Sequence, residues 1–244
     1  MPVLSRPKNA ALLVESIRAT TTTPYSILFL CSPGDTKQVA ACRKTGANVH
    51  VVDWDPGRSD YPRKMNLGYR MTRREFILMA ADDLTFQEGW DTQVLAVAQE
   101  TGASVIGTND CANRQVMKGL FSTHALVRRS YVQETGASLD GPGILVSETY
   151  DHNYCDRELC GLAKSRGVWA FAPESRLLHR HPIWRTTSWD DTYAKGKENA
   201  VTDHENFLMR CQHWGDIGLM PQELKHLRQT RRKHARLARR RTRT

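Results

Sequence analysis

Two adjacent carboxylates, Asp82 and Asp83, follow directly on the apolar run "FILMAA" at residues 76–81. Such a run is typical of a buried strand, so we expect both acids at the end of a strand. Neighbouring carboxylates repel each other and lose favourable hydration when they are buried together, so their charge must be compensated. A metal ion, a basic side chain or water could provide this compensation, and the residues alone leave all three open.

A divalent cation suits these residue types, because carboxylate oxygens are ligands that Mg²⁺ and Mn²⁺ prefer. His179 and His181 stand two residues apart in "LLHRHP", so they share one face of an extended segment. We therefore expect a Mn²⁺ or Mg²⁺ site formed by Asp83, His179 and His181. The alternative is that Asp82 ends a strand, Asp83 begins a turn and the histidines lie on the surface.

Asp156 and Glu158, in "HNYCDRE", are candidate catalytic acids. A carboxylate at this place could act as a general base that takes a proton from an attacking hydroxyl. On a helix these two side chains would point about 200° apart, so only one could face a given site. The alternative is an exposed acidic helix start, which the helix dipole favours.

Polar residues elsewhere are candidates for binding a ligand. Lys64 can neutralise a phosphate, and Asn66 can bind a ribose or hold a loop. Arg6 and Asp53 each follow a short expected strand. Ligands of open α/β sheets bind beyond the carboxyl ends of the strands, which is where these residues are expected.

Strand-like and helix-like segments alternate over the first 110 residues. We expect strands near residues 25–32, 48–54, 75–81 and 104–110, and helices near residues 9–19, 36–47 and 90–102. This repetition favours an α/β fold, with a mostly parallel, doubly wound (Rossmann-like) sheet flanked by helices. The chain has no GxGxxG and no GxxxxGK[ST], which disfavours a Rossmann dinucleotide site and a P-loop.

The second half is less regular. We expect a strand leading into a short helix over residues 121–136, a helix from about Cys155 and a strand at residues 168–173. Leu159, Leu162 and Ala163 have the spacing of an inward helix face.

Composition indicates one domain with its own core, because the chain has 244 residues and 40% hydrophobic content. No apolar run reaches the length of about 18 residues that a membrane span needs. Lys8 and Asn9 precede any long apolar region, so a secretory leader is not expected. The six cysteines show no CxxC pair and no zinc spacing, so we expect reduced thiols in a cytoplasmic protein.

The net charge of +9 is concentrated at the C-terminus. Ten Lys or Arg and no acid lie between Lys225 and Arg243, so the remainder of the chain is close to neutral. Such a tail can bind phosphate backbones or acidic protein surfaces, and the alternative is a solvated, partly helical extension. We expect a domain over residues 1–214 and a basic extension over residues 215–244.

Together these segments resemble the GT-A glycosyltransferases, especially the family 2-like group and its bacteriophage-encoded members. The resemblance covers about residues 1–214 and rests on the order of "SRP", "RKMNLGY", "FILMAADDLTFQEGWD", "HNYCDRE", "LLHRHP" and "DDTYAKGKENAVTDHENFLMR". The chain departs from the Asp-x-Asp pattern of the family at Ala81, which cannot bind a metal and stands where the first acid is expected.

The resemblance implies a metal-assisted, inverting transfer of a sugar from a nucleotide sugar to an acceptor hydroxyl, with a UDP-sugar as the expected donor. It implies Asp83 as the main metal ligand, Asp82 as a contact to ribose or to metal-bound water, and Asp156 as the base. The residues expected to bind the donor are Arg6, Asp53, Lys64, Asn66, Asp82 and Trp90. Tyr150 and His152 are expected to line the sugar or acceptor pocket.

The acceptor and the competing functions stay open at this point. A phage enzyme in the host cytoplasm could modify a virion protein, DNA or a host surface polymer. The main alternative is a nucleic-acid-binding protein that acts through its basic tail. Nucleotidyl transfer is disfavoured, because "VLSRPKNAA" holds no Gly-rich phosphate loop.

Overall fold

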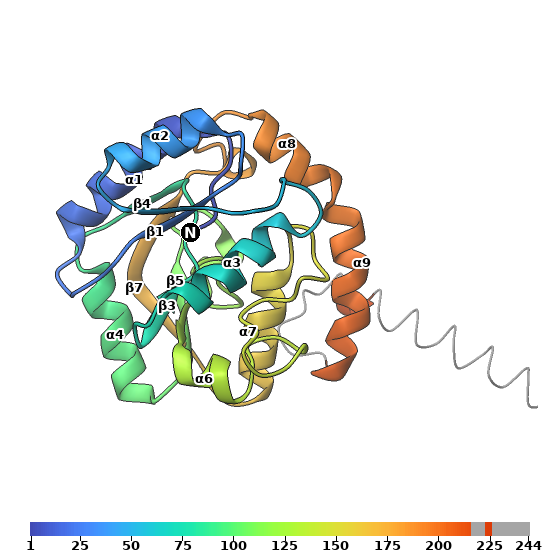
Figure 1. The fold of residues 1–244 in the computed structure, drawn as a ribbon. Helices are drawn as coiled ribbons and strands as arrows, with labels where there is room; N and C mark the ends of the chain where they lie inside the picture. The colour runs from blue at the N-terminus through green and yellow to red at the C-terminus, as the bar shows by residue number, and fades with distance from the viewer. Residues whose placement is uncertain (216–222, 226–244) are drawn as a thin grey trace, which may run out of the picture.

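The computed structural model describes residues 1–215 and 223–225, which form an α/β body (Figure 1). Its helices are α1 (Pro7–Thr20), α2 (Thr36–Lys44), α3 (Asp60–Met71), α4 (Trp90–Thr101), α5 (Arg114–Met117), α6 (Arg129–Glu134), α7 (Cys155–Ser165), α8 (Asp191–Glu198) and α9 (Ala200–Arg210), with 3₁₀ turns η1 (Pro182–Trp184) and η2 (Cys211–His213). Its strands are β1 (Leu28–Cys31), β2 (Asn48–Val51), β3 (Phe76–Leu78), β4 (Leu84–Phe86), β5 (Val105–Asn109), β6 (Leu126–Arg128) and β7 (Trp169–His179).

The main sheet is mixed, which corrects the expectation of a mostly parallel sheet. Its order is β3-β6-β5-β7-β4, and β1 pairs with β2 in a separate parallel ladder. Within the main sheet β5 and β7 run parallel, whereas β3–β6, β5–β6 and β4–β7 are antiparallel. The strand-helix-strand repetition of the first half did not reveal that β6 and β4 run against their neighbours.

The main sheet separates two apolar cores. Val105 pairs with Val127 and Ile106 pairs with Leu126, and successive strand residues point to opposite faces. The two valines lie in a core with residues of α3, α6, α7 and α9. The isoleucine and the leucine lie in a core with residues of α1, α2 and α4 (Figure 1). The main sheet is therefore packed on both faces, and this packing supports the side chains at its edge.

Several expected elements are confirmed. The buried face of α1 is Ala10, Leu13, Val14 and Ile17, the four residues with helical spacing. Gly102 ends α4 with a φ of +65°, a conformation that glycine adopts without steric cost. The helix expected near Cys155 is α7, which buries Leu159, Leu162 and Ala163.

Several elements, among them α3 and β4, have no counterpart among the expected segments. Pro62 and Gly68 weaken the helical signal of α3, but Pro62 lies in the first turn, where proline is tolerated. A Cβ atom on Gly68 would lie 3.1 Å from Leu30 Cδ1, so the glycine lets α3 pack closely against β1. The three residues of β4 are too few to give a periodic pattern.

Part of the expected extension packs against the domain. Glu223 is buried, and its carboxylate accepts hydrogen bonds from Arg157 of α7 at 2.9 and 2.7 Å. Apart from Lys225, the basic residues of the tail lie outside the described residues. No helix of the described part is both long and apolar enough to cross a membrane. All six cysteines fall within it and are free thiols.

Candidate functional site

The two acids lie side by side where the chain passes from β3 to β4. Asp82 and Asp83 are each 5% exposed. Leu84, the next residue, pairs with His179 at the end of β7, and Arg180 N–H donates to the Asp83 carbonyl at 2.9 Å. The short antiparallel ladder therefore holds the end of β7 against the acids.

Arg6 is the basic side chain nearest to this pair. Its Nη1 lies 3.4 Å from Asp82 Oδ1 and 3.6 Å from Asp83 Oδ2. Its other nitrogens donate to Asp190, Nε at 2.8 Å and Nη2 at 3.0 Å, and its guanidinium covers the Tyr193 ring at 3.6 Å. Of the three kinds of compensation that the sequence left open, the structure contains the basic side chain. Arg6 carries one positive charge and contacts three carboxylates, those of Asp82, Asp83 and Asp190, so it cannot neutralise all of their negative charge.

The two carboxyls titrate in opposite directions. Burial and the charge of Asp83 raise the pKa of Asp82 to about 7, although Arg6 works against this. Burial alone would raise the pKa of Asp83, but a hydrogen bond to His179, the nearby His179 and His124 and the Tyr193 hydroxyl bring that pKa well below its ordinary value. Asp83 is therefore the ionised member of the pair, and Asp82 gains or loses its proton near neutral pH.

Of the two predicted histidines, His179 lies closer to the acids. His179 Nε2 is 3.5 Å from Asp83 Oδ2. The His181 ring lies 5.2 Å from the His179 ring and 4.6 Å from the Tyr193 ring, and His181 Nδ1 accepts a hydrogen bond from Ile183 N–H at 3.2 Å. Burial and the neighbouring His179 lower the pKa of His181 to about 4, so the ring is neutral at physiological pH. The structure thus places His179 next to Asp83. His181 Nδ1 instead accepts a hydrogen bond within the following 3₁₀ turn.

Buried polar atoms without partners mark the place where a ligand fits. Asp82 Oδ2 and Asp83 Oδ1 have no hydrogen-bond partner. Buried polar groups are almost always paired, so such a group of unpaired atoms indicates a binding site. Within residues 1–215 and 223–225 no three His, Cys, Asp or Glu side chains are grouped so that they could hold a metal by themselves. Asp83 and His179 fit a divalent cation as two protein ligands that leave other positions for a ligand or water.

Tyr193 of α8 closes one side of this group of residues. Its hydroxyl lies 2.8 Å from both Asp83 Oδ2 and the Arg180 carbonyl, so its proton can go to either. Asp190 caps the same helix by accepting from Tyr193 N–H at 2.9 Å. Sequence reasoning gave no role to Tyr193, to Asp190 or to His124, a buried histidine whose ring lies 4.8 Å from that of His179. The "DDTY" segment was the available signal for Asp190 and Tyr193, since Asp at a helix start is a capping residue.

Asp156 lies in the first turn of α7 and faces the same region. Burial raises its pKa to about 6, and Arg157, backbone hydrogen bonds and nearby His179 lower it in part. His152 precedes α7, and its ring meets Tyr61 edge-on at 5.1 Å. Asp83 influences both rings electrostatically, so Tyr61 and His152 belong to the surroundings of the acids.

Glu158 is directed elsewhere, as its position two residues after Asp156 on a helix requires. Its carboxylate, 1% exposed, accepts hydrogen bonds from Leu139 N–H, the Tyr150 hydroxyl and Arg210 at 2.6 to 3.0 Å. Tyr150 is itself fully buried. The structure therefore places the predicted catalytic Glu158 and the predicted pocket residue Tyr150 in one internal ion-pair network.

Lys64 and Asn66 are likewise occupied within the fold. Lys64 is fully buried, and its ammonium group donates to Ser32 at 2.6 Å and to Asp60 at 2.7 Å. Asn66 is fully buried and holds the loop at residues 145–148, accepting from Leu145 and Val146 N–H and donating to the Val146 carbonyl and to Glu148. The alternative in which Asn66 holds a loop is the one that the structure shows.

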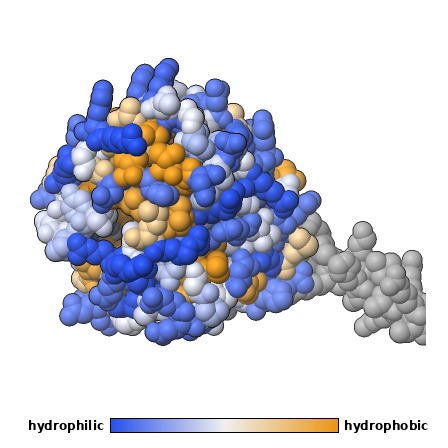
Figure 2. Space-filling view, in the orientation of Figure 1, coloured by the Kyte–Doolittle hydropathy of each residue, from blue (hydrophilic) through white to orange (hydrophobic). Residues whose placement is uncertain are grey.

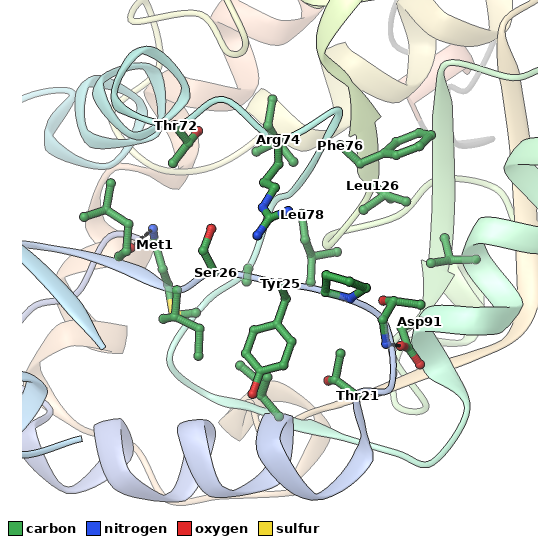
Figure 3. A pocket seen from close by; sticks show the side chains of 18 of the residues that line it. Met1, Thr21, Tyr25, Ser26, Thr72, Arg74, Phe76, Leu78, Asp91 and Leu126 are labelled. Carbon is green, nitrogen blue, oxygen red and sulfur yellow. Dashed lines mark hydrogen bonds between the residues drawn. The ribbon is translucent and has the colours of Figure 1, made fainter. Parts of the chain in front are cut away.

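Trp90 contributes to a different pocket from that of the acids, and Asp53 follows β2. Trp90 donates its indole N–H to Thr21 at 2.9 Å and lines an apolar pocket of about 220 Å³. This pocket lies beside β1 and β3, with Tyr25, Arg74, Phe76 and Leu78 on its walls (Figure 3), on a face where apolar side chains gather (Figure 2). Asp53 is exposed after β2. None of the residues Arg6, Asp82, Asp83 and His179 lines this pocket.

Three proteins with solved structures have folds similar to that of this chain. A mannosyltransferase of Pyrobaculum calidifontis, in complex with GDP-Man and Mn²⁺, matches with a TM-score of 0.65 at 9% identity over 93% of this chain and 66% of that one. Glucosyl-3-phosphoglycerate synthase of Mycobacterium tuberculosis matches with a TM-score of 0.60 at 12% identity over 86% of this chain and 78% of that one. TarS of S. aureus matches with a TM-score of 0.54 at 13% identity over 72% of this chain and 57% of a fragment.

These likenesses show that the chain has the fold of the GT-A glycosyltransferases. The chain spans under two thirds of the length of the TarS fragment and of the mannosyltransferase. No family model matches the chain, and no curated protein matches it in sequence. The resemblance to bacteriophage-encoded members stays a prediction.

Proposed function

We propose that the protein is a metal-assisted glycosyltransferase that takes a sugar from a nucleotide-sugar donor, with a UDP-sugar as the first candidate. One observation carries the proposal. Asp82 and Asp83 each hold a buried carboxylate oxygen without a hydrogen-bond partner, and His179 Nε2 lies 3.5 Å from Asp83, in a fold shared with glycosyltransferases. The mannosyltransferase was solved with GDP-Man and Mn²⁺, and the mycobacterial synthase with UDP and Mn²⁺ or Mg²⁺, which supports a donor and a cation of these kinds.

Asp83 and His179 would hold the cation, with His181 as a further candidate. A bound Mn²⁺ or Mg²⁺ supplies positive charge that stabilises the diphosphate of the leaving nucleotide. Asp83 suits this role because it keeps its negative charge well below neutral pH. Asp82 suits a contact to ribose or to water, since a carboxyl with a pKa of about 7 can donate or accept a proton.

The remaining side chains would position the substrates and move the proton. Asp156 is the candidate general base, because its pKa of about 6 leaves it ionised and still basic at neutral pH. His152 and Tyr61 form an edge-on aromatic pair at the start of α7, which suits a wall of the acceptor pocket. Arg6 bridges the two acids and Asp190, and its positive charge suits contact with an incoming diphosphate. Inversion at the sugar, a domain boundary near residue 214 and a virion or DNA acceptor remain part of the proposal.

Release of nucleoside diphosphate tests the proposal directly. The full chain is incubated with UDP-, GDP- and dTDP-sugars in Mn²⁺, in Mg²⁺ and in EDTA. We expect release from one donor only with the cation, and loss of that release in Asp83→Ala. Glu100→Ala, an exposed acid at the end of α4, is the control and should behave as the wild type. Equal release by Asp83→Ala, or no release and no donor-induced thermal stabilisation, would contradict the proposal.

A further inference from the structure

His124 is a buried histidine that the proposed reaction does not use. It lies just before β6, is 3% exposed, and its Nδ1 is 3.0 Å from the Met79 carbonyl oxygen. A carbonyl oxygen can only accept, so Nδ1 of the neutral ring carries the proton and Nε2 carries a lone pair.

The ring next to His124 also has a buried nitrogen without a partner. His124 Nε2 and His179 Nδ1 are both buried, and neither has a hydrogen-bond partner among the described residues. The two rings lie 4.8 Å apart at 82°. His179 turns its other nitrogen, Nε2, to Asp83 at 3.5 Å. An acceptor and a possible donor therefore lie next to each other in a space that burial keeps from water.

We propose that His124 is the positioning residue of His179, and that His124 Nε2 accepts the Nδ1–H of His179. This pairing holds a proton on His179 Nδ1 and leaves Nε2 directed at Asp83, where it can donate to the carboxylate without a cation or release that proton to bind one. A histidine that binds a metal through Nε2 must carry its proton on Nδ1, and an acceptor for that proton orients the ring and strengthens binding. The pairing links the Met79 carbonyl to His179 of β7. Met79 lies just before Asp82 and Asp83 in the chain.

Asp110 is the competing acceptor. Its Oδ2 is buried without a partner, and its backbone carbonyl accepts from His179 N–H at 3.0 Å. Its other oxygen, Oδ1, accepts from Ala112 and Asn113 N–H, which ties the carboxylate to its own turn. Asp110→Asn keeps an oxygen for these two bonds, so it is a matched control for the loss of the charge.

The location of the His179 proton tests the pairing by itself. Long-range ¹H–¹⁵N spectra of the metal-free full chain, with His179→Ala to assign the signals, show which ring nitrogen carries a proton. We expect His179 to carry a slowly exchanging proton on Nδ1 in the wild type and in His124→Gln, whose amide can both donate to Met79 and accept from His179. His124→Phe keeps the ring volume without an acceptor and should lose this slowly exchanging proton. An unchanged His179 in His124→Phe, or the same loss in Asp110→Asn, would overturn the proposal.

Mn²⁺ binding in the presence of UDP tests what the pairing does, and it rests on the proposed function. We expect His124→Phe to bind Mn²⁺ about 10- to 100-fold more weakly than the wild type, as other losses of such acceptors do. His124→Gln and Asp110→Asn should stay close to the wild type. If His124→Phe binds as tightly as the wild type, His124 does not position a ligand and the inference fails while the proposed function stands. If the wild type binds no Mn²⁺ and the proton pattern is as expected, the metal part of the proposed function fails and the pairing stands.

Discussion

Leu84 of β4 pairs directly with His179 of β7, and this places the preceding residue, Asp83, 3.5 Å from the His179 imidazole. The pairing joins two segments that lie far apart in the chain. The three residues of β4 matter for the site because strand register decides which side chains lie opposite each other. The carboxylate pair, Arg6 and His179 are consequently held by backbone pairing and not only by their own attraction.

Arg6→Ala should destabilise the protein more at high pH than at low pH. Removal of one partner from a buried ion pair typically costs about 3–5 kcal/mol. At pH 5 Asp82 can protonate and so lose its need for a cation, because its pKa is about 7. We expect the loss in the free energy of unfolding, measured with urea in EDTA, to be larger at pH 8 than at pH 5. Lys37→Ala, which removes an exposed cation on α2, should show no such difference.

Asp82→Asn should flatten the pH dependence of stability. The pKa of Asp82 rises from an ordinary 3.8 to about 7 on folding. Between these values the folded state holds a proton that the unfolded state has lost, so stability falls as the pH rises from about 4 to about 7. One such group contributes a slope of up to about 1.4 kcal/mol per pH unit. Thermal unfolding of both proteins in EDTA from pH 4 to 8 measures the difference, and parallel curves would show that Asp82 does not titrate in this way.

The sequence predicted more of the fold than of the site. The α1 face, the Gly102 cap and the α7 face followed from local periodicity, and the structure confirms them. The antiparallel β4 and β6 did not follow, because strand direction depends on partners far away in the chain.

Residue type alone could not separate binding residues from internal ones. Lys64, Asn66 and Glu158 are polar residues in suggestive motifs, but each satisfies buried partners within the fold. Arg6 is different, because its position at the start of α1 brings it to the acids from 76 residues away. Only the packed chain shows that Asp82 and Asp83 keep buried oxygens without a partner, whereas Lys64, Asn66 and Glu158 do not.

Asp156→Asn should lower transfer to an acceptor without weakening donor binding. Positioned general bases typically contribute about 10²- to 10⁴-fold to a rate. Because the pKa of Asp156 is about 6, the activity of the wild type should rise as the pH passes through this value and the carboxyl loses its proton. Initial rates with the acceptor, together with a titration of UDP, check both parts. A rate in Asp156→Asn within a factor of two or so of the wild type would rule out Asp156 as the base.

Glu158→Gln should destabilise the protein and leave the chemistry intact. The variant leaves Arg210 with the more exposed Asp140 as an ion-pair partner, so the loss should fall below the cost of about 3–5 kcal/mol for a buried charge left unpaired. Because Glu158 is engaged by Leu139, Tyr150 and Arg210, we expect donor release per folded molecule to be unchanged at a temperature where the variant is folded. Urea unfolding measures the expected loss of stability, and nucleoside diphosphate release measures whether the chemistry is unchanged. A stable variant with lost release would return Glu158 to the list of catalytic candidates.

Removal of residues 226–244 separates the enzyme from the alternative of a nucleic-acid-binding protein. The deleted segment carries nine Lys or Arg and no acid, which equals the whole net charge of +9, so the remaining chain has a formal charge of zero. Binding to phosphate backbones depends on such charges and weakens steeply with salt. We therefore expect the truncated protein to lose its affinity for a DNA duplex, measured by fluorescence anisotropy at several salt concentrations.

Nucleoside diphosphate release should continue, because Asp83, His179 and Asp156 all lie in the retained domain. A truncated protein that keeps DNA affinity would place the nucleic-acid contact on the domain, whereas one that loses donor release would show that the tail serves the reaction itself.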